Sequence, residues 1–219
     1  MNRPTSMCNH YIIHQLPICK LYQLAEFVVY QNYKHHTKGV ENDYRDEILS
    51  VYKEELSYSA YSHILVAATY DDQIIGSIRL MNWDRRQKLP IQTHFHLASF
   101  THLLPNSRAT IWHIGRFAVN SDANCGFTLF KQLMLYAMEP IYENKNDILL
   151  AECDNKLLRT MKLMGIQAQR LGEGLKYLGS ETTPIYITYS GMADFFQKNR
   201  DLLYRIPGHS KFCYHRLNF

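Results

Sequence analysis

This chain of 219 residues contains no long hydrophobic run. Its apolar stretches span only a few residues each, far short of the roughly 18 that a transmembrane helix needs. Residues 1–20 also lack the basic start, apolar centre and small-residue cleavage site of a secretory signal. We therefore expect a globular protein of the cytoplasm.

Cysteine is scarce, and its spacing excludes two classes of protein. The five cysteines are odd in number and far apart, and no C-x-x-C pair occurs. This pattern argues against a disulfide scaffold and against a cysteine-ligated zinc domain. We expect reduced thiols in the core at the five positions, which are Cys8, Cys19, Cys125, Cys153 and Cys213.

Runs of like charge, repeats and low-complexity tracts are absent as well. The net charge of +4 is mild and dispersed, which argues against nucleic-acid binding but would not oppose docking of an acidic protein. An apolar fraction of 46%, with 16 tyrosines and 10 phenylalanines, excludes disorder. The length fits one domain with a sizeable core.

The hydrophobic periodicity predicts alternating helices and strands. Apolar residues recur at helical spacing over residues 17–33 and 46–56. Two segments rich in β-formers, 63–70 and 73–83, are separated by Asp71-Asp72 and predict an antiparallel hairpin. Residues 84–108 lose the pattern and read as a long loop with one short helix, and loops of that length are often functional.

The second half predicts the order strand, helix, strand, helix, strand, helix. The expected strands are 110–119, 148–153 and 184–190. The first expected helix is capped by one of Asn120, Ser121, Asp122 and Asn124, the second has Asp154 as N-cap, and the third begins at 192. A hairpin followed by such alternation predicts an α/β fold with a mixed sheet and helices on both faces.

The segment WHIGRFAV, residues 112–119, is the most informative stretch. It places His113 and Arg116 inside an otherwise apolar strand, where a charge is costly unless a ligand or an ion pair compensates it. Ligands bind beyond the carboxyl ends of parallel strands, so residues 117–119 and 151–153 should flank a gap. The sequence therefore predicts a site beside this strand.

Four motifs, in this order, carry a resemblance to a known family. They are VENDYRD at 40–46, IIGSIRL at 74–80, WHIGRFAV at 112–119 and LLRTMKLMGIQAQRLGEGLKYLG at 157–179. Together they resemble the acyl-homoserine lactone synthase and N-acyl amino acid synthase branch of the Gcn5-related N-acyltransferase superfamily. The matching positions are Asp43, Asp46, Gly76, Arg79, Leu80, Trp112, Arg116 and Phe117, with His113 where that family has glutamate.

The resemblance implies a fold and an activity. It implies one acyltransferase domain over 1–219, with an N-terminal helical part to about 60, a core sheet over 61–190 and a C-terminal helix and tail over 191–219. The implied fold is a mixed, mostly antiparallel sheet with helices on both faces and a splayed central strand pair. The implied reaction transfers a fatty acyl group to the amine of an amino acid or a related small molecule.

Two departures bear on the substrates. No arginine lies between Arg3 and Arg45, and the segment after Asp46 is long, which argues against S-adenosylmethionine as the acceptor. The stretch NSDANCGFTLF, residues 120–130, lacks the glycine-rich loop with which ordinary acetyltransferases hold the coenzyme A pyrophosphate. The resemblance therefore implies acyl carrier protein as donor ahead of acyl-CoA, no permanently bound cofactor, and peripheral membrane contact at most.

Candidate site residues follow from the residue chemistry and the resemblance together. His113 and Glu152 are the candidate bases, because each can take a proton from an ammonium group. A buried neutral histidine and a structural ion-pair partner are the alternative interpretations. The expected donor-binding residues are Arg116, Phe117, Ala118, Val119, Asn124 and Gly126, the central strand contributing backbone N–H groups.

Asp43, Asp46 and Arg79 are the expected acceptor-binding residues. Arg79 and Arg116 should lie on neighbouring strands, where they would hold a carboxylate of the acceptor or pair with Asp43 and Asp46. A structural ion-pair network and surface acids at a helix start are the alternatives.

Other candidates are weaker. His94, His96 and His102 have spacing that suits zinc, but no cysteine or acidic group accompanies them, so no metal site is expected. Aromatic and methionine side chains at helical spacing suit either an acyl-chain wall or plain core, namely Phe127, Phe130, Met134, Met161 and Met164. An acetyl-CoA-dependent acetyltransferase and a non-catalytic acyl-binding relative remain the rival functions.

Overall fold

The computed structural model describes residues 11–36, 43–97, 100–120, 122–123, 125–177 and 180–205. The strands are β1 (Tyr11–Gln15), β2 (Ser62–Thr69), β3 (Ile74–Asn82), β4 (Ile111–Val119), β5 (Ile148–Asp154), β6 (Gln169–Arg170), β7 (Leu175–Tyr177) and β8 (Ser180–Ile187). The α-helices are α1 (Leu21–His36), α2 (Arg45–Tyr58), α3 (Pro90–Phe95), α4 (Gly126–Glu143), α5 (Asn155–Leu163) and α6 (Tyr189–Asn199). Three 3-10 turns span Ile18–Lys20, Thr101–Leu103 and Arg200–Arg205.

All these strands form one sheet in the order β1-β2-β3-β4-β5-β8-β6, with β7 also paired to β8. The β4–β5 pair is parallel and the other pairs are antiparallel. Asp72, at φ 64°, closes the β2–β3 hairpin, a conformation that aspartate tolerates. The predicted mixed, mostly antiparallel sheet is confirmed.

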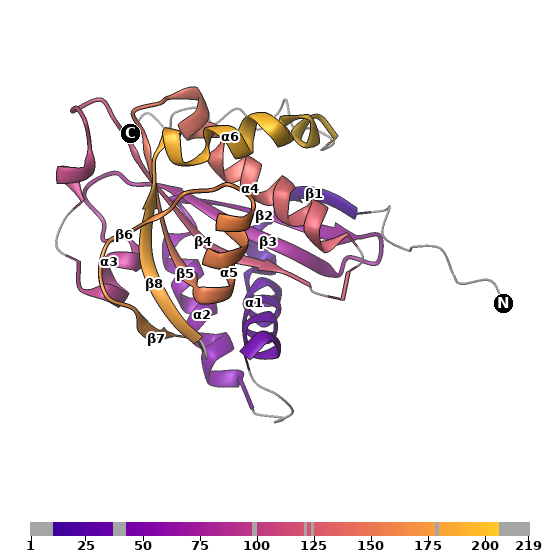
Figure 1. Cartoon of the computed structure of the whole chain (residues 1–219). Coiled ribbons are helices and arrows are strands. Elements are labelled where there is room, and N and C mark those ends of the chain that lie inside the picture. Colours follow the sequence, from indigo (N-terminus) through magenta and orange to yellow (C-terminus); the bar gives the residue numbers. More distant parts are fainter. Residues whose placement is uncertain are drawn as a thin grey trace.

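Helices cover both faces of the sheet, as predicted (Figure 1). On one face α4 packs against β3 and α6, and the largest core cluster includes Leu129, Leu133, Met138 and Phe195. On the opposite face α1 packs against β3, β4 and α2. The apolar stripe of α1 accounts for this, because Leu24, Val28 and Leu21 are buried at helical spacing.

The structure departs from the sequence prediction mainly at its edges. The edge strand β1 was not predicted, and α1 begins after a 3-10 turn and runs three residues past the expected end. Strand β8 begins at Ser180, four residues early, because the polar segment 180–183 pairs with β5 and β7. Helix α6 begins at Tyr189 instead of residue 192.

A β-bulge shapes the centre of the sheet. Between Ser77 and Arg79 on β3, strand β4 carries one extra residue, and Arg116 adopts φ 51°. The Ser77 hydroxyl donates a 2.7 Å hydrogen bond to the carbonyl of Arg116 and holds the bulge. Bulges increase local twist and re-aim side chains, so β4 turns away from β5 beyond this point.

No α-helix of the described residues is long and apolar enough to cross a bilayer.

Gly191 tests the packing of α6. A Cβ there would lie 2.4 Å from the backbone oxygen of Gln167, so the Gly191→Ala variant forces the backbone to shift. We expect the free energy of unfolding to fall by about 1–3 kcal/mol, measured by urea denaturation. The matched control is Gly172→Ala, whose Cβ would lie 3.7 Å from Pro184, an ordinary contact. Equal stabilities of the two variants would contradict this packing.

Candidate functional site

Strands β4 and β5 part at the centre of the sheet. Their parallel pairing runs from Ile111–Ile148 to Ile114–Ala151 and stops there, although both strands continue. Two cavities occupy the gap, an inner one of about 100 Å³ and an outer one of about 370 Å³. Both are lined by Asn32, Phe117, Asp154 and Leu157, so they adjoin. The predicted splayed pair is confirmed.

The inner cavity is lined from both faces of the sheet. Glu54 of α2 and His94 of α3 line it on one side, while Met134 of α4 and Met161 of α5 line it on the other. Its charged and imidazole side chains are Glu54, Arg79, His94, Arg116, Glu152 and Asp154. A slot that crosses the sheet and combines an apolar wall with a charged one can hold two different reactants.

A buried carboxylate from α2 joins two arginines. Glu55 is fully buried and forms ion pairs with Arg79 and Arg116, the latter through Nε at 2.6 Å. Arg116 also places Nη2 2.8 Å from Oε2 of Glu54. Burial opposes the charge on Arg116, but Glu55 and Glu54 outweigh it and raise the pKa of Arg116 well above its usual value. The two carboxylates therefore compensate the charge of an arginine that lies inside a strand.

Glycine is required opposite Arg79. A Cβ on Gly115 would lie 2.5 Å from Nη2 and 3.0 Å from Cζ of Arg79, so the guanidinium lies across the backbone of β4 at this residue. Tyr58 covers the guanidinium at 5.7 Å from its ring centre. The glycine within WHIGRFAV therefore makes room for the buried ion-pair network.

Glu152 holds two imidazoles. Its Oε2 lies 2.9 Å from Nε2 of His113, and its Oε1 lies 3.4 Å from Nδ1 of His94. Burial raises the pKa of Glu152, but His113, His94 and Arg79 outweigh it and hold that pKa well below its usual range. Glu152 therefore stays ionised and fixes the orientation of both rings.

His94 lies at the site because it belongs to α3, a short helix whose N-terminus is capped by its own sequence. Pro90 occupies the first turn, and the side chain of Gln92 accepts a 3.0 Å hydrogen bond from the N–H of Leu89. His94 then stacks near Tyr177 of β7, with ring centres 4.6 Å apart, and its Nε2 lies 3.8 Å from Oε2 of Glu54. The predicted long loop thus delivers a histidine to the cavity.

The outer cavity lies at the open ends of β4 and β5. Phe127 and Phe130 of α4 line it beside the backbone of residues 117–120, and Phe130 packs edge-on against Phe117 at 4.8 Å. Lys156 of α5 is its basic lining residue. The N-terminus of α4 opens here at Gly126, whose own N–H bonds the carbonyl of Ala123. The groove is mostly apolar, with Lys156 as its cation and Asp154 as its carboxylate.

Most of the predicted donor-binding residues line these cavities. Arg116 lines the inner cavity, Phe117 lines both, and Ala118, Val119 and Gly126 line the outer one. Asn124 lies outside the described residues. Of the predicted wall side chains, Phe127 and Phe130 line the outer cavity and Met134 and Met161 the inner one, whereas Met164 lines neither.

The predicted bases differ in their access to the cavity. Glu152 lines the inner cavity, with 12% of its side chain exposed. His113 is fully buried behind it and does not line either cavity. Because Glu152 lies between His113 and the inner cavity, His113 cannot contact a reactant bound there.

The predicted acceptor acids lie elsewhere. Asp43 and Asp46 are exposed at the start of α2 and line neither cavity. Asp43 pairs with its neighbour Arg45, and this hydrogen bond lowers the pKa of Asp43. The alternative that these acids pair with Arg79 and Arg116 is wrong, because Glu54 and Glu55, about two and a half turns further along α2, hold both arginines. Arg79 itself does line the inner cavity.

Sequence reasoning missed Glu54, Glu55 and His94 as site residues. Glu55 continues the spacing of the buried Ile48 and Val51 on α2, so a carboxylate on an apolar stripe was the available signal. His94 was weighed only as a metal ligand. His96 and His102 are exposed, and no group of three or more potential ligands is arranged to hold a metal within the described parts of the chain.

No protein-family model matches this sequence, and no curated protein is similar to it. Solved structures are similar in fold. The acyl-homoserine lactone synthase LasI has a TM-score of 0.52 and 18% identity, with 86% of this chain and 95% of that chain covered. The N-acyl amino acid synthase FeeM from uncultured soil microbes has a TM-score of 0.53 and 13% identity, with 88% and 98% covered.

Two more structures extend the comparison. The CoA-dependent acyl-homoserine lactone synthase BjaI has a TM-score of 0.53 and 17% identity, with 88% of this chain and 89% of that chain covered. An acetyltransferase of the GNAT family from Staphylococcus aureus has a TM-score of 0.50 and 14% identity, with 81% and 98% covered. These likenesses confirm the Gcn5-related N-acyltransferase fold that the four motifs predicted.

Glu55 tests the buried network. The Glu55→Gln variant leaves two buried guanidinium groups without their shared carboxylate, so we expect it to lose about 3–5 kcal/mol of stability in chemical denaturation. Asp46→Asn is the matched control, because it removes the same charge from an exposed position of the same helix and should cost less than about 1 kcal/mol. The network has no structural role if the two variants unfold alike.

Proposed function

We propose that this chain, on the fold of the Gcn5-related N-acyltransferases, transfers a fatty acyl group from a thioester to the amine of an amino acid or a related small molecule. The observation that carries the proposal is the slot between β4 and β5, where an apolar groove meets a cavity with charged side chains. The motif resemblance and the similar synthases support the same reaction class. We assign the activity to one domain over residues 1–219, working in the cytoplasm, where such thioesters are made.

The outer groove fits the arm that carries the thioester. An extended pantetheine chain can lie along β4 from Val119 toward Phe117, because no described strand pairs with β4 on the side of the gap beyond Ile114. Backbone N–H groups of residues 117–119 are then in position to donate to the thioester carbonyl and stabilise the oxyanion that forms. Phe127, Phe130 and Leu157 supply apolar contacts for the arm.

The charge of the groove favours acyl carrier protein as donor over acyl-CoA. Lys156 and the N-terminus of α4 match the single phosphate of a phosphopantetheine arm. The pyrophosphate of coenzyme A needs more donors than these. Acyl-CoA is the second candidate donor, because one of the similar structures is a CoA-dependent synthase.

His94 is the base in this proposal. It lines the inner cavity, whereas His113 does not, and an imidazole nitrogen can take a proton from an ammonium group. When Nδ1 of His94 donates a hydrogen bond to Glu152, the other ring nitrogen is left to accept a proton. The lowered pKa of Glu152, caused by its imidazole neighbours and Arg79 against the effect of burial, makes that carboxylate a weak base and a good orienting partner. His113 then positions Glu152 from behind.

The reaction follows by direct attack. His94 takes a proton from the ammonium group, and the freed lone pair on nitrogen attacks the thioester carbonyl carbon. The tetrahedral intermediate collapses with cleavage of the carbon–sulfur bond, and the electron pair leaves on sulfur. The imidazolium returns its proton to the thiolate, and the attacking nitrogen releases its second proton to water. Cys153 lines the cavity, but burial and the nearby carboxylates raise the pKa of its thiol, so no thiolate is available for an acyl-enzyme.

Donor preference tests the function. We expect the purified chain to release thiol fastest from a long-chain acyl carrier protein, more slowly from the matched acyl-CoA, and least from acetyl-CoA, with the N-acylated amine identified by mass spectrometry. Preference for acetyl-CoA would make the chain an acetyltransferase. Binding of the acylated carrier without any product would make it an acyl-binding protein, and either result contradicts the proposal.

Substitution of His94 tests the base. We expect His94→Ala to lower kcat/KM by about 10²–10⁴-fold and to abolish the rise of kcat/KM with pH that deprotonation of a histidine produces. The control is His102→Ala, an exposed histidine outside both cavities, which should keep the wild-type profile. Cys153→Ala should keep turnover as well. A wild-type pH profile in His94→Ala would rule out this role.

A further inference from the structure

We infer that the acceptor is a cationic amine without a carboxylate beside its nitrogen, because the carboxylates of the inner cavity outnumber its two arginines and both arginines are already paired. The inference rests on the proposed acyl transfer and narrows its acceptor. The proposed function allows two classes of acceptor, which are free amino acids and amines that lack the carboxylate of an amino acid. The inference selects the second class.

The cavity carries an excess of negative charge. Glu54, Glu152 and Asp154 line it, and Glu55 lies directly behind. Four carboxylates thus face two guanidinium groups when the imidazoles are neutral. Such a cavity attracts an ammonium group and opposes a second anion.

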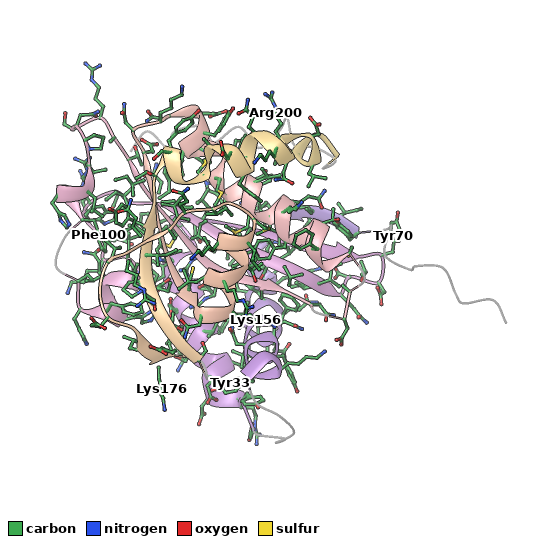
Figure 2. The ribbon with its side chains drawn as sticks, in the orientation of Figure 1. Tyr33, Tyr70, Phe100, Lys156, Lys176 and Arg200 are labelled. Carbon is green, nitrogen blue, oxygen red and sulfur yellow. The ribbon has the colours of Figure 1, made fainter. Side chains whose placement is uncertain are left out.

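No lysine corrects this balance among the cavity-lining residues of the described chain. Lys156 lines only the outer cavity. Lys176 precedes Tyr177 on β7, but its side chain extends away from the molecule (Figure 2). The cations available to an acceptor's carboxylate are therefore Arg79 and Arg116.

Arg79 is not available. Its side chain is 1% exposed, it pairs with Glu55, and its guanidinium lies against Gly115 and under Tyr58. Its Nε has no hydrogen-bond partner but lies on the backbone of β4, 3.1 Å from the position of a Cβ on Gly115. No carboxylate of a ligand can reach that atom.

Arg116 is already ion-paired with both carboxylates of α2. Nε pairs with Glu55 at 2.6 Å, Nη2 lies 2.8 Å from Glu54, and Nη1 donates to the hydroxyl of Tyr177 at 3.3 Å. Its side chain is 6% exposed. Its Nη2 forms no hydrogen bond in spite of this ion pair, but a bidentate clamp on a carboxylate needs two free parallel N–H groups, and Nε and Nη1 each have a partner already.

Glu54 keeps an acceptor atom for a ligand. Oε1 of Glu54 is buried without a hydrogen-bond partner, and its nearest cation is Nη1 of Arg79 at 3.8 Å. Burial opposes ionisation of Glu54, but Arg116, Arg79 and His94 lower its pKa, so it is charged at neutral pH. An ammonium group between Glu54 and Glu152 gains two charged hydrogen bonds, next to His94 as proton acceptor. A carboxylate on the neighbouring carbon would face the same two anions.

The test compares matched acceptors on the purified full chain. Tyramine, tyrosine and tyrosine methyl ester are offered with one fatty acyl thioester, and kcat/KM is measured for each N-acyl product by mass spectrometry. We expect tyramine to exceed tyrosine by about 10-fold or more, and the ester to recover most of the difference because its carboxyl group is neutral. Putrescine and ornithine provide a second pair with an aliphatic chain.

The outcomes separate the two proposals. Tyrosine, or ornithine at its α-amine, acylated as fast as the matched amine overturns the acceptor class and leaves acyl transfer standing. No acylation of any amine overturns the function itself. Recovery by the methyl ester must accompany the tyramine preference, because a preference without it reflects size and not charge, and that result also overturns the inference.

A variant supplies an internal control. In Glu54→Gln one anion is removed and Nη2 of Arg116 loses its charged partner, so we expect the tyramine-to-tyrosine ratio of kcat/KM to fall at least several-fold. The ratio within one preparation does not depend on the folded fraction, so partial unfolding cannot imitate the result. An unchanged ratio contradicts the assigned role of Glu54.

Discussion

The double ion pair of Glu55 with Arg79 and Arg116 is the constraint on which the rest of the structure depends. It joins α2 to two adjacent strands, although α2 packs mainly on α1. Because the carboxylate is fully buried, its partners cannot move apart without leaving charge unpaired in the interior. The network therefore fixes the wall of the inner cavity before any reactant enters it.

Most of the fold could be predicted from the sequence, because local patterns specify it. The β2–β3 hairpin, the strand of WHIGRFAV and the Asp154 cap of α5 all depend on neighbouring residues, and the structure confirms them. The splay of β4 and β5 followed from the resemblance. Its local cause, the bulge at Arg116, has no sequence signal, because glycine and not arginine is the residue expected at positive φ.

The candidate site could be predicted only in part, because pairing across the sheet is not a local property. His113, Arg116 and Arg79 stood out as polar residues within strands, but both arginines pair with carboxylates of α2, far along the chain, and His113 pairs across the sheet with β5. Asp43 was favoured over Glu55 by a motif, whereas burial selects Glu55. His94 lies in a segment without periodicity, so only the folded chain could bring it to Glu152.

The two halves of the slot come from different substructures. The outer groove is built by α4, α5 and the end of β4, whereas the acid–base side chains of the inner cavity come from α2, from α3 and from Glu152. The segment between β3 and β4, which contains α3, contacts the groove nowhere among its lining residues. Sequence drift within that segment can therefore alter the inner cavity at His94 while the lining of the outer groove stays the same.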